Sequence, residues 1–322
     1  MTFFLWRKLL RDSRTSFLVI FLLLMLFQVF WVMVTKRVTT EFSPLFRGIA
    51  NRLNVAEDSF QKHFFSGPGK VMQSIMGGED VRFNKPQDML AVGYLHPLIQ
   101  TIFCIWAIGR AAGAIAGEID KGTMELLLAQ PLSRGQIVLA HFLVDLLLIP
   151  LLAIGLWLGT LLGTFLSGPF QINESKFELF SISIPIDSQT LVVDPMVLAP
   201  SIWNIAALLF ALSGLTMWIS SRHRFKGRAV SIAVLVVLIQ FIVNVLGQLW
   251  DTISYLRPLT IFYYYQPQRI SLQHEWTIDP GLIWTGEPMV ALNVVAVLFA
   301  VGLLGYLLAW RTFERRDIPA PL

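Results

Sequence analysis

The chain has 322 residues, of which 55% are hydrophobic and 14% are charged, and its formal net charge is +4. A soluble domain of this length requires far more polar surface, so the composition indicates an integral membrane protein. The basic excess lies in short segments beside apolar runs, which argues against nucleic acid as the partner. The single cysteine, Cys104, excludes an intrachain disulfide, a cysteine-rich metal site and a dithiol redox pair.

Residues 1–15 combine aromatic and aliphatic side chains with four cations, Arg7, Lys8, Arg11 and Arg14. The pattern predicts an amphipathic helix that lies in the membrane interface. The alternative is that these cations only flank the first spanning helix. Residues 17–34 are apolar and long enough to span a membrane, and no small-residue cleavage site follows them. We therefore expect an uncleaved first span.

Residues 36–89 predict an external loop with short amphipathic helices. Between its Gly and Pro breakers, apolar residues recur at roughly helical spacing: Phe46, Ile49, Leu53, Phe60 and Phe64. Gly69-Lys70 resembles part of a phosphate-binding loop. However, Val71 stands where Ser or Thr is required, and Phe64 stands where the leading Gly is required. The motif occurs nowhere else in the chain, so any ATPase has to be a separate polypeptide.

The second predicted span covers residues 90–116 and carries Arg110 near one end. Three glycines recur at every fourth position: Gly109, Gly113 and Gly117. Small residues at this spacing let the backbone of another helix approach closely. We therefore expect this face of the second span to contact another helix.

A polar insert at residues 117–135 predicts a short helix. Gly122 interrupts the preceding segment, and Thr123 has the side chain of an N-cap. Glu125 then falls in the first turn, where the helix dipole favours a negative charge. Pro131 ends the helix, because it lacks a backbone N–H and restricts the residue before it.

Ser133 and Gln136 have the spacing of a capping box, and an apolar run begins directly behind them. This predicts the start of the third span, residues 136–166, with Pro150 as the position of a kink. The insert is therefore expected to be held between two spanning helices.

The rest of the chain predicts three further spans. A polar loop at residues 167–194 leads to the fourth span, residues 196–220, and the fifth follows at residues 229–249. Residues 251–287 form an aromatic, proline-bearing loop before the sixth span at residues 288–310.

The charges of the short segments predict the orientation. Cations precede the first span, fill the turn between the fourth and fifth spans and follow the sixth: Arg7, Lys8, Arg11, Arg14, Arg222, Arg224, Lys226, Arg228, Arg311, Arg315 and Arg316. The positive-inside rule places both termini and the 117–135 insert in the cytoplasm. The loops after the third and fifth spans, residues 167–194 and 251–287, are net acidic and are then external. The long 36–89 loop is slightly basic but also external, since long loops translocate regardless of charge.

The polar insert resembles the coupling helix of the permease subunits of ATP-binding cassette (ABC) transporters, type-2 exporter class. The matching residues follow one another in order: Glu118, Gly122, Thr123, Glu125, Leu126, Leu127, Leu128, Pro131, Ser133 and Arg134. An ordinary cytoplasmic loop with good helix caps is the alternative. The resemblance implies an all-α membrane protein in which residues 1–322 form one permease domain. Six transmembrane helices follow an interfacial helix, and a cytoplasmic coupling helix joins spans two and three.

The resemblance also implies the partners. Two permease subunits, here expected to be a homodimer, pair around a central path in a bacterial or archaeal plasma membrane. Two copies of a cytoplasmic ABC ATPase subunit bind ATP and Mg²⁺ and dock on the coupling helices, so this chain is expected to be no enzyme and to hold no cofactor. The family exports chemically diverse substrates, and the substrate here is unidentified. Residues 258–267 are similar to an external re-entrant segment before the last helix; an aromatic loop at the membrane interface is the alternative.

Eight residues of the insert are assigned to ATPase coupling by the resemblance: Glu118, Gly122, Thr123, Glu125, Gln130, Pro131, Ser133 and Arg134. Glu125, Gln130 and Arg134 are the expected contacts with the ATPase, because a short rigid helix transmits force as a unit. Glu118 and Arg134 are also placed to pair across the base of the insert.

Asp145 is the only acid within a predicted span, and His141 lies one turn before it. Arg110 lies at a similar distance from the insert on the preceding helix. Two interpretations stay open: Arg110 and Asp145 neutralise each other, or Asp145 has a role with a substrate or a proton. His141 and Asp145 are too few ligands to predict a metal site.

Three other classes of protein are the alternatives to an ABC exporter permease. A membrane enzyme requires a nucleophile, base or metal constellation, and only His141 and Asp145 lie at membrane depth. A secondary transporter usually shows repeated halves and broken helices, which are not visible here. A permease-like subunit that transmits ATPase motion to an external partner, without conducting a substrate, is compatible with the long first loop.

Overall fold

The computed structural model describes residues 2–56, 59, 63, 82, 85–172, 175–179, 182–186 and 188–316. Within these ranges six segments are helical, long and apolar enough to cross a membrane. They are Phe3–Glu41, Pro86–Asp120, Arg134–Ser167, Pro195–Arg222, Lys226–Leu249 and Val294–Arg315. The prediction of six spanning helices is therefore confirmed, whereas the fold is mostly helical and not all-α, because the described residues also include short strands.

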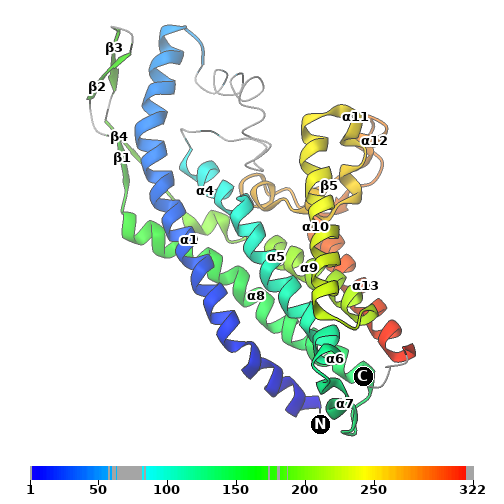
Figure 1. The fold of residues 1–322 in the computed structure, drawn as a ribbon. Helices are drawn as coiled ribbons and strands as arrows, with labels where there is room; N and C mark the ends of the chain where they lie inside the picture. The colour runs from blue at the N-terminus through cyan, green and yellow to red at the C-terminus, as the bar shows by residue number, and fades with distance from the viewer. Residues whose placement is uncertain are drawn as a thin grey trace.

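The helices and strands follow in chain order, and Figure 1 shows the start of α1 and the end of α13 on the side of the molecule that carries α6 and α7. The helices are α1 Thr2–Arg52, α4 Pro86–Leu95, α5 Pro97–Ala112, α6 Glu118–Asp120, α7 Thr123–Leu128, α8 Arg134–Ser167, α9 Ser201–Arg222, α10 Lys226–Leu249, α11 Asp251–Ser254, α12 Gly281–Trp284 and α13 Val294–Arg315. Shorter 3-10 or π turns are η1 Gly113–Gly117, η2 Pro195–Leu198, η3 Arg257–Leu259, η4 Ile261–Tyr264 and η5 Arg269–Gln273. The strands are β1 Phe170–Ile172, β2 Ser175–Leu179, β3 Ile182–Ile186, β4 Gln189–Leu191, β5 Thr277–Ile278 and β6 Leu292–Asn293.

The first helix differs from the prediction at both ends. Residues 2–14 are not a separate helix but the first turns of α1, because no Gly or Pro breaks the chain before residue 17. At the other end α1 continues past residue 34 to Arg52, so the first part of the predicted 36–89 loop is helical. Ile49 lies in this extension, whereas Phe60 and Phe64, and the Gly69-Lys70-Val71 sequence, lie outside the described residues.

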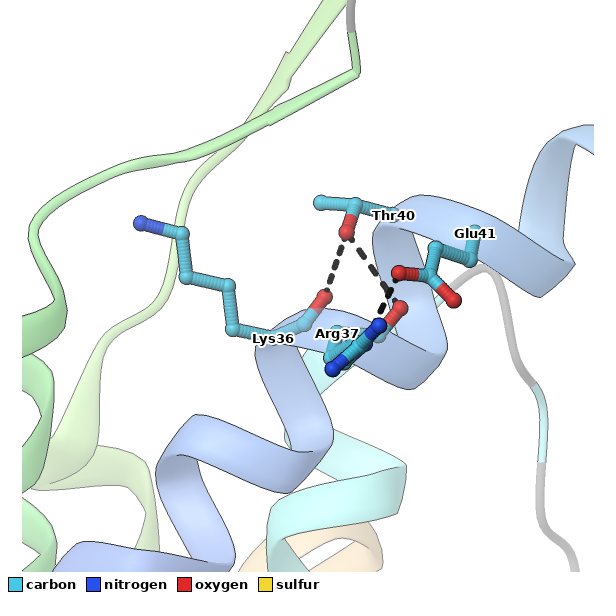
Figure 2. Close-up of polar contacts among 4 residues, drawn as sticks. All are labelled: Lys36, Arg37, Thr40 and Glu41. Carbon is cyan, nitrogen blue, oxygen red and sulfur yellow. Dashed lines mark hydrogen bonds and ion pairs between the residues drawn. The ribbon is translucent and has the colours of Figure 1, made fainter.

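Local hydrogen bonds explain how a polar sequence continues α1. The Thr40 hydroxyl donates to the Lys36 carbonyl at 2.8 Å, and Arg37 Nε pairs with Glu41 Oε1 at 2.9 Å, one turn along the helix. Figure 2 shows Lys36 extending away from the Arg37–Glu41 pair. The Lys36 ammonium instead donates to the carbonyl of Ser167, the last residue of α8. A cation at a helix C-terminus satisfies a free carbonyl and complements the helix dipole.

The closest helix crossing is not where the glycine pattern places it. A Cβ at Gly109 would meet nothing within 4 Å, and one at Gly113 would meet only the Lys226 side chain at 3.8 Å. Backbones touch between α9 and α13, where a Cβ at Gly214 would lie 2.1 Å from the Gly302 carbonyl oxygen, and between α1 and α8, where one at Gly159 would lie 2.5 Å from the Met25 carbonyl oxygen. A Cβ at Gly117 would lie 3.5 Å from the Lys226 side chain, so Gly113 and Gly117 face a side chain of α10. The predicted close approach of another helix backbone along Gly109, Gly113 and Gly117 is not found among the described residues, because spacing reveals small residues but not which helix faces them.

Residues 167–194 contain four short strands in place of the expected irregular loop. β1 pairs antiparallel with β4, and β2 pairs antiparallel with β3. Phe170 is buried, and the Lys36 ammonium lies 5.9 Å from the centre of its ring. The β1–β4 pair therefore packs beside the extension of α1, as Figure 1 shows.

The aromatic segment before the last span turns back into the protein. Tyr263, Tyr264 and Tyr265 are buried, and the Asn204 side chain of α9 holds the segment by accepting from the Gln266 N–H at 2.8 Å. The Tyr265 hydroxyl donates to the Tyr94 carbonyl at 2.6 Å, and burial raises the pKa of Tyr265 above its ordinary value. This burial favours the re-entrant interpretation over an aromatic loop at the membrane interface.

The last span begins later than predicted, at Val294. Asn293 caps α13 by accepting from the Ala296 N–H at 3.0 Å. The preceding residues are held in a turn by Asp279, whose carboxylate accepts from the Met289 and Val290 N–H groups. These bonds, together with the β5–β6 pair, keep residues 288–293 out of the helix.

Candidate coupling site and buried charge cluster

The polar insert forms a short helix where the sequence predicts one. α7 spans Thr123–Leu128, and Gly122 precedes it in the left-handed region, with φ of 71°. Glu125 lies in the first turn, as expected. Thr123 is not the N-cap; its hydroxyl donates to the Glu118 carboxylate at 2.6 Å. That prediction is wrong because Gly122 is the N-cap residue. Its left-handed conformation, which is costly for other residues, makes the turn, and the Thr123 hydroxyl binds Glu118 in the preceding helix.

The exit from α7 follows the predicted capping box. The helix ends at Leu128, ahead of Pro131. The Ser133 hydroxyl accepts from the Gln136 N–H at 3.2 Å, and the Gln136 side-chain oxygen accepts from the Ser133 N–H at 2.9 Å. The backbone N–H groups of Ser133 and Gln136, which have no partner within the helix, are thereby hydrogen-bonded. The predicted capping box is confirmed.

One side of α7 is anchored and the other is free. Met124 is 1% exposed and belongs to the hydrophobic core. Leu126 is 69% exposed beside exposed Glu125 and Gln130. Sequence reasoning missed Leu126 as a surface group, because a run of three leucines gives no sign of which one faces outward. The eight residues predicted to couple divide by exposure: Gly122, Glu125, Gln130, Pro131 and Ser133 are exposed, whereas Glu118, Thr123 and Arg134 are partly buried.

Arg134 does not pair with Glu118. Its guanidinium donates to the Arg316 carbonyl and, at 3.4 Å, to the Phe313 carbonyl at the C-terminal end of α13. The last carbonyls of a helix lack intrahelical donors, and a cation there also complements the helix dipole. The expected pair across the base of the insert is therefore replaced by a contact between the start of α8 and the end of α13.

Arg316 extends this contact to a third helix. Its guanidinium donates to the carbonyls of Ser221 and His223, at 2.9 and 3.0 Å, where α9 ends. Partial burial lowers the pKa of Arg316 from its ordinary value, but an arginine stays charged at neutral pH. Arg134 and Arg316 thus connect the start of α8 to the ends of α9 and α13. Arg134 lies close to α7 in the chain, because α8 follows α7.

A serine of α9 is inserted into the backbone of the second span just before α7. The Ser220 hydroxyl donates to the Ala112 carbonyl at 3.0 Å and accepts from the Ala116 N–H at 3.0 Å. In an α-helix these two backbone groups would bond directly to each other. Residues Gly113–Gly117 form a π-helix instead, which is the expected result of a side chain entering the ladder.

The start of α10 is linked to α6, the short helix that leads into α7. The Asp120 carboxylate accepts from the Lys226 N–H at 3.2 Å, at the first residue of α10. A carboxylate at a helix N-terminus satisfies a free donor and interacts favourably with the dipole. The segment that leads into α7 therefore contacts both α9 and α10, which no spacing in the sequence indicated.

The buried cluster joins three different helices through two charges and a hydroxyl. Arg110 of α5 and Asp145 of α8 form an ion pair with a shortest distance of 2.5 Å, and their side chains are 11% and 1% exposed. The Tyr306 hydroxyl of α13 donates to the other carboxylate oxygen of Asp145. The predicted Arg110–Asp145 pair is confirmed. The sequence did not predict Tyr306 as a partner, because a tyrosine in an apolar helix gives no sign of what its hydroxyl contacts.

His141 takes part through its backbone. Its carbonyl accepts from the Arg110 guanidinium at 3.1 Å, whereas its ring Nδ1 is buried and has no partner in the described part of the chain. Among the described residues no group of three or more His, Cys, Asp or Glu is placed to hold a metal ion. The cluster therefore joins helices through charge and hydrogen bonds.

Six helical spans, with a short helix that has one free face between the second and third span, define the class: an integral membrane protein. The model of the ABC-2 family transporter proteins matches residues 6–318, so the chain belongs to that family. No curated protein and no solved structure matches the chain. Members of the ABC-2 family are membrane subunits without a nucleotide-binding domain of their own, and they work with ATPase subunits.

Proposed function

We propose that this chain is the membrane subunit of an exporter, and that α7 docks onto a separate cytoplasmic ABC ATPase. Two copies of the chain pair around the transport path, and two ATPase subunits bind ATP and Mg²⁺ and drive the export of a substrate. The observation that carries the proposal is the geometry of α7. It is short, fixed at both ends, anchored by Met124 and exposed at Glu125 and Leu126.

The contacts behind α7 support a mechanical role. A force on α7 reaches α5 through the π-helix, α9 through Ser220 and α10 through Asp120. Arg134 joins the start of α8 to the end of α13. Packed elements with specific contacts move as units, so displacement of one short helix is transmitted to several spans at once. All eight predicted coupling residues lie between Glu118, at the start of α6, and Arg134, at the start of α8.

The proposed orientation places both termini and α7 in the cytoplasm of a bacterial or archaeal cell. It is supported by the cations of the short segments, which lie at the end of the molecule that carries α7 (Figure 1). In a Cys104→Ala background, a cysteine at exposed Ser188 should react with an impermeant reagent in intact cells. A cysteine at exposed Gln130 should react only after permeabilisation. The reverse pattern would rule out this orientation.

The docking proposal is tested by reversing one charge. Glu125→Arg changes an exposed side chain, so the isolated subunit should keep its stability within about 0.5 kcal/mol. At a docking surface the same reversal costs several kcal/mol through like-charge contact. We expect the variant to insert and melt normally but to lose copurification with the ATPase and the stimulation of ATP hydrolysis.

Glu287→Arg is the matched control, because Glu287 is also exposed and lies near α12 at the opposite end of the molecule. It should leave ATPase binding unchanged. If Glu125→Arg binds and stimulates the ATPase as well as Glu287→Arg does, α7 is not the docking helix.

For the buried cluster we propose a structural role. Asp145 has a cation on one carboxylate oxygen and a hydroxyl donor on the other, and both partners come from neighbouring helices. A carboxylate that is already paired and hydrogen-bonded has little remaining capacity to bind a substrate cation.

A second candidate function is transmission of ATPase motion to an external partner without conduction. The length of α1 favours it. With 51 residues, α1 is about 76 Å long, whereas the hydrocarbon core of a bilayer is about 30 Å thick. The extension and the β1–β4 pair beside it form a projecting surface at the end opposite α7 (Figure 1). ATP-dependent movement of a substrate into vesicles by the complex would exclude this alternative.

A further inference from the structure

The first turns of α1 carry a strongly basic face. Four exposed cations form it: Arg7, Lys8, Arg11 and Arg14. The other side of the same turns packs against the hydrophobic core through Leu5, Trp6 and Leu9. The apolar side is therefore occupied by the protein itself, and the cations point away from it. The basic face is therefore free to bind a partner outside the chain.

The charge of this face is almost uncompensated. The nearest acid is Asp12, whose carboxylate lies 4.0 Å from Arg11 Nε, and both side chains are largely exposed. Exposed ion pairs of this kind contribute little. Arg7, Lys8 and Arg14 make no ion pair within the part of the chain that the structure describes. Four cations and one carboxylate give residues 2–14 a net charge of +3.

The register of α1 shows what this face meets. Because α1 is unbroken, residues spaced by three or four positions lie on one stripe along its whole length. The stripe through Lys8 and Arg11 continues through Leu18, Leu22 and Leu26, which are exposed. Exposed leucines of a spanning helix face lipid hydrocarbon. The cations therefore lie in line with the lipid-facing stripe and just beyond its end.

We propose that the basic face binds the headgroup phosphates of anionic phospholipids in the adjoining leaflet. Arg11 is seven residues, or about 10 Å, along the axis from Leu18, so its long side chain reaches the headgroup layer. Guanidinium groups bind phosphate oxygens with paired hydrogen bonds. The exposed rings of Phe3 and Phe4 supply the apolar contact that basic interfacial segments combine with charge.

A docked acidic protein is the other possible occupant of a basic face. It would approach from beyond the membrane, whereas this face continues the stripe that lipid covers. The observations therefore favour lipid. The inference does not depend on the proposed ATPase coupling, because it concerns the purified chain and a phospholipid alone.

The test uses the full chain in detergent, titrated with phosphatidylglycerol or phosphatidylcholine while bound lipid is counted by native mass spectrometry. One cation near an anionic lipid surface contributes about fivefold in affinity. The wild type should prefer phosphatidylglycerol, and Arg7→Gln/Arg11→Gln/Arg14→Gln should lower that preference by at least about tenfold. Raising the salt concentration should weaken the wild-type preference.

The matched control is Arg228→Gln/Arg311→Gln/Arg315→Gln, which removes three exposed cations from α10 and α13. It should lower the preference less than the N-terminal variant does, because these three cations are divided between two helices and do not form one face. Should the N-terminal triple variant fail to fold, Arg7→Gln alone should lower the preference by about fivefold.

Two results would overturn the proposal. One is an N-terminal variant that retains its preference for phosphatidylglycerol, including the case in which it loses ATPase copurification and so reveals a protein-binding face. The other is full displacement of phosphatidylglycerol by millimolar inorganic phosphate, which would make the face a general anion site.

Discussion

Asp145 and Glu125 carry the same charge in opposite surroundings. Asp145 is buried among α5, α8 and α13, with a cation on one oxygen and a hydroxyl on the other. Glu125 is exposed on α7, and in the described part of the chain its carboxylate makes no hydrogen bond or ion pair. A buried charge has to be satisfied within the protein, whereas an exposed one is available to a partner. Burial therefore separates the polar groups that hold this protein together from those suited to docking.

Removing Asp145 should give the largest effect on stability. Asp145→Leu leaves Arg110 buried without its partner, which costs about 3–5 kcal/mol for a pair of this kind. Arg110→Met/Asp145→Leu removes both charges and should recover most of the loss. The Tyr306 hydroxyl then loses its acceptor, so adding Tyr306→Phe should recover more. Melting temperature of the purified subunit is the measurement. A double variant that melts no higher than the worse single variant would show that the ion pair contributes nothing.

An intermediate effect is expected at Ser220, which connects the buried region to the docking region. Ser220→Ala removes the hydroxyl that bridges Ala112 and Ala116, and unsatisfied buried groups cost about 1–3 kcal/mol. If the π-helix rewinds into an α-helix, the stability loss is smaller. Every residue beyond it then rotates by about 100° around the axis, which displaces α7. ATPase stimulation should therefore fall more than the melting temperature does.

Ser221→Ala is the control for this comparison. Ser221 is as buried as Ser220, but its hydroxyl donates only to the Trp218 carbonyl of its own helix. Its loss should affect stability slightly and leave ATPase stimulation unchanged. Equal effects of the two alanine variants on stimulation would show that the Ser220 bridge has no special role.

The smallest effect on stability is expected at Leu126. Leu126→Gln replaces an exposed leucine, so the isolated subunit should change by no more than about 0.5 kcal/mol. If the exposed leucine is buried when the ATPase docks, the variant should still weaken ATPase copurification, since burying a leucine contributes about 1.5–3 kcal/mol.

Leu259→Gln tests whether replacing any exposed leucine weakens ATPase copurification. Leu259 is 70% exposed, against 69% for Leu126, but it lies near α11 at the opposite end of the molecule (Figure 1). Only Leu126→Gln should weaken binding. A similar loss in both variants would point to a general effect on the subunit and not to docking through α7.

The sequence by itself determined the features that depend on neighbouring residues. Six apolar runs of sufficient length predict six spans, because crossing the hydrocarbon core takes about 20 consecutive, predominantly apolar residues. Ser133 and Gln136 predict the start of α8, because a capping box is complete within four residues. The Arg110–Asp145 pair could be anticipated as well, because two lone opposite charges in adjacent spans have few other partners.

Only the tertiary structure decided the contacts between segments that are far apart in the chain. Arg134 binds the end of α13, more than 170 residues away, and Ser220 enters the second span from α9. The pairing of Gly214 with Gly302, and of Tyr306 with Asp145, is equally invisible in spacing. A helical period shows which residues share a face, but not which helix that face meets. That choice is made by packing the whole set of helices at once, which no local pattern of residues encodes.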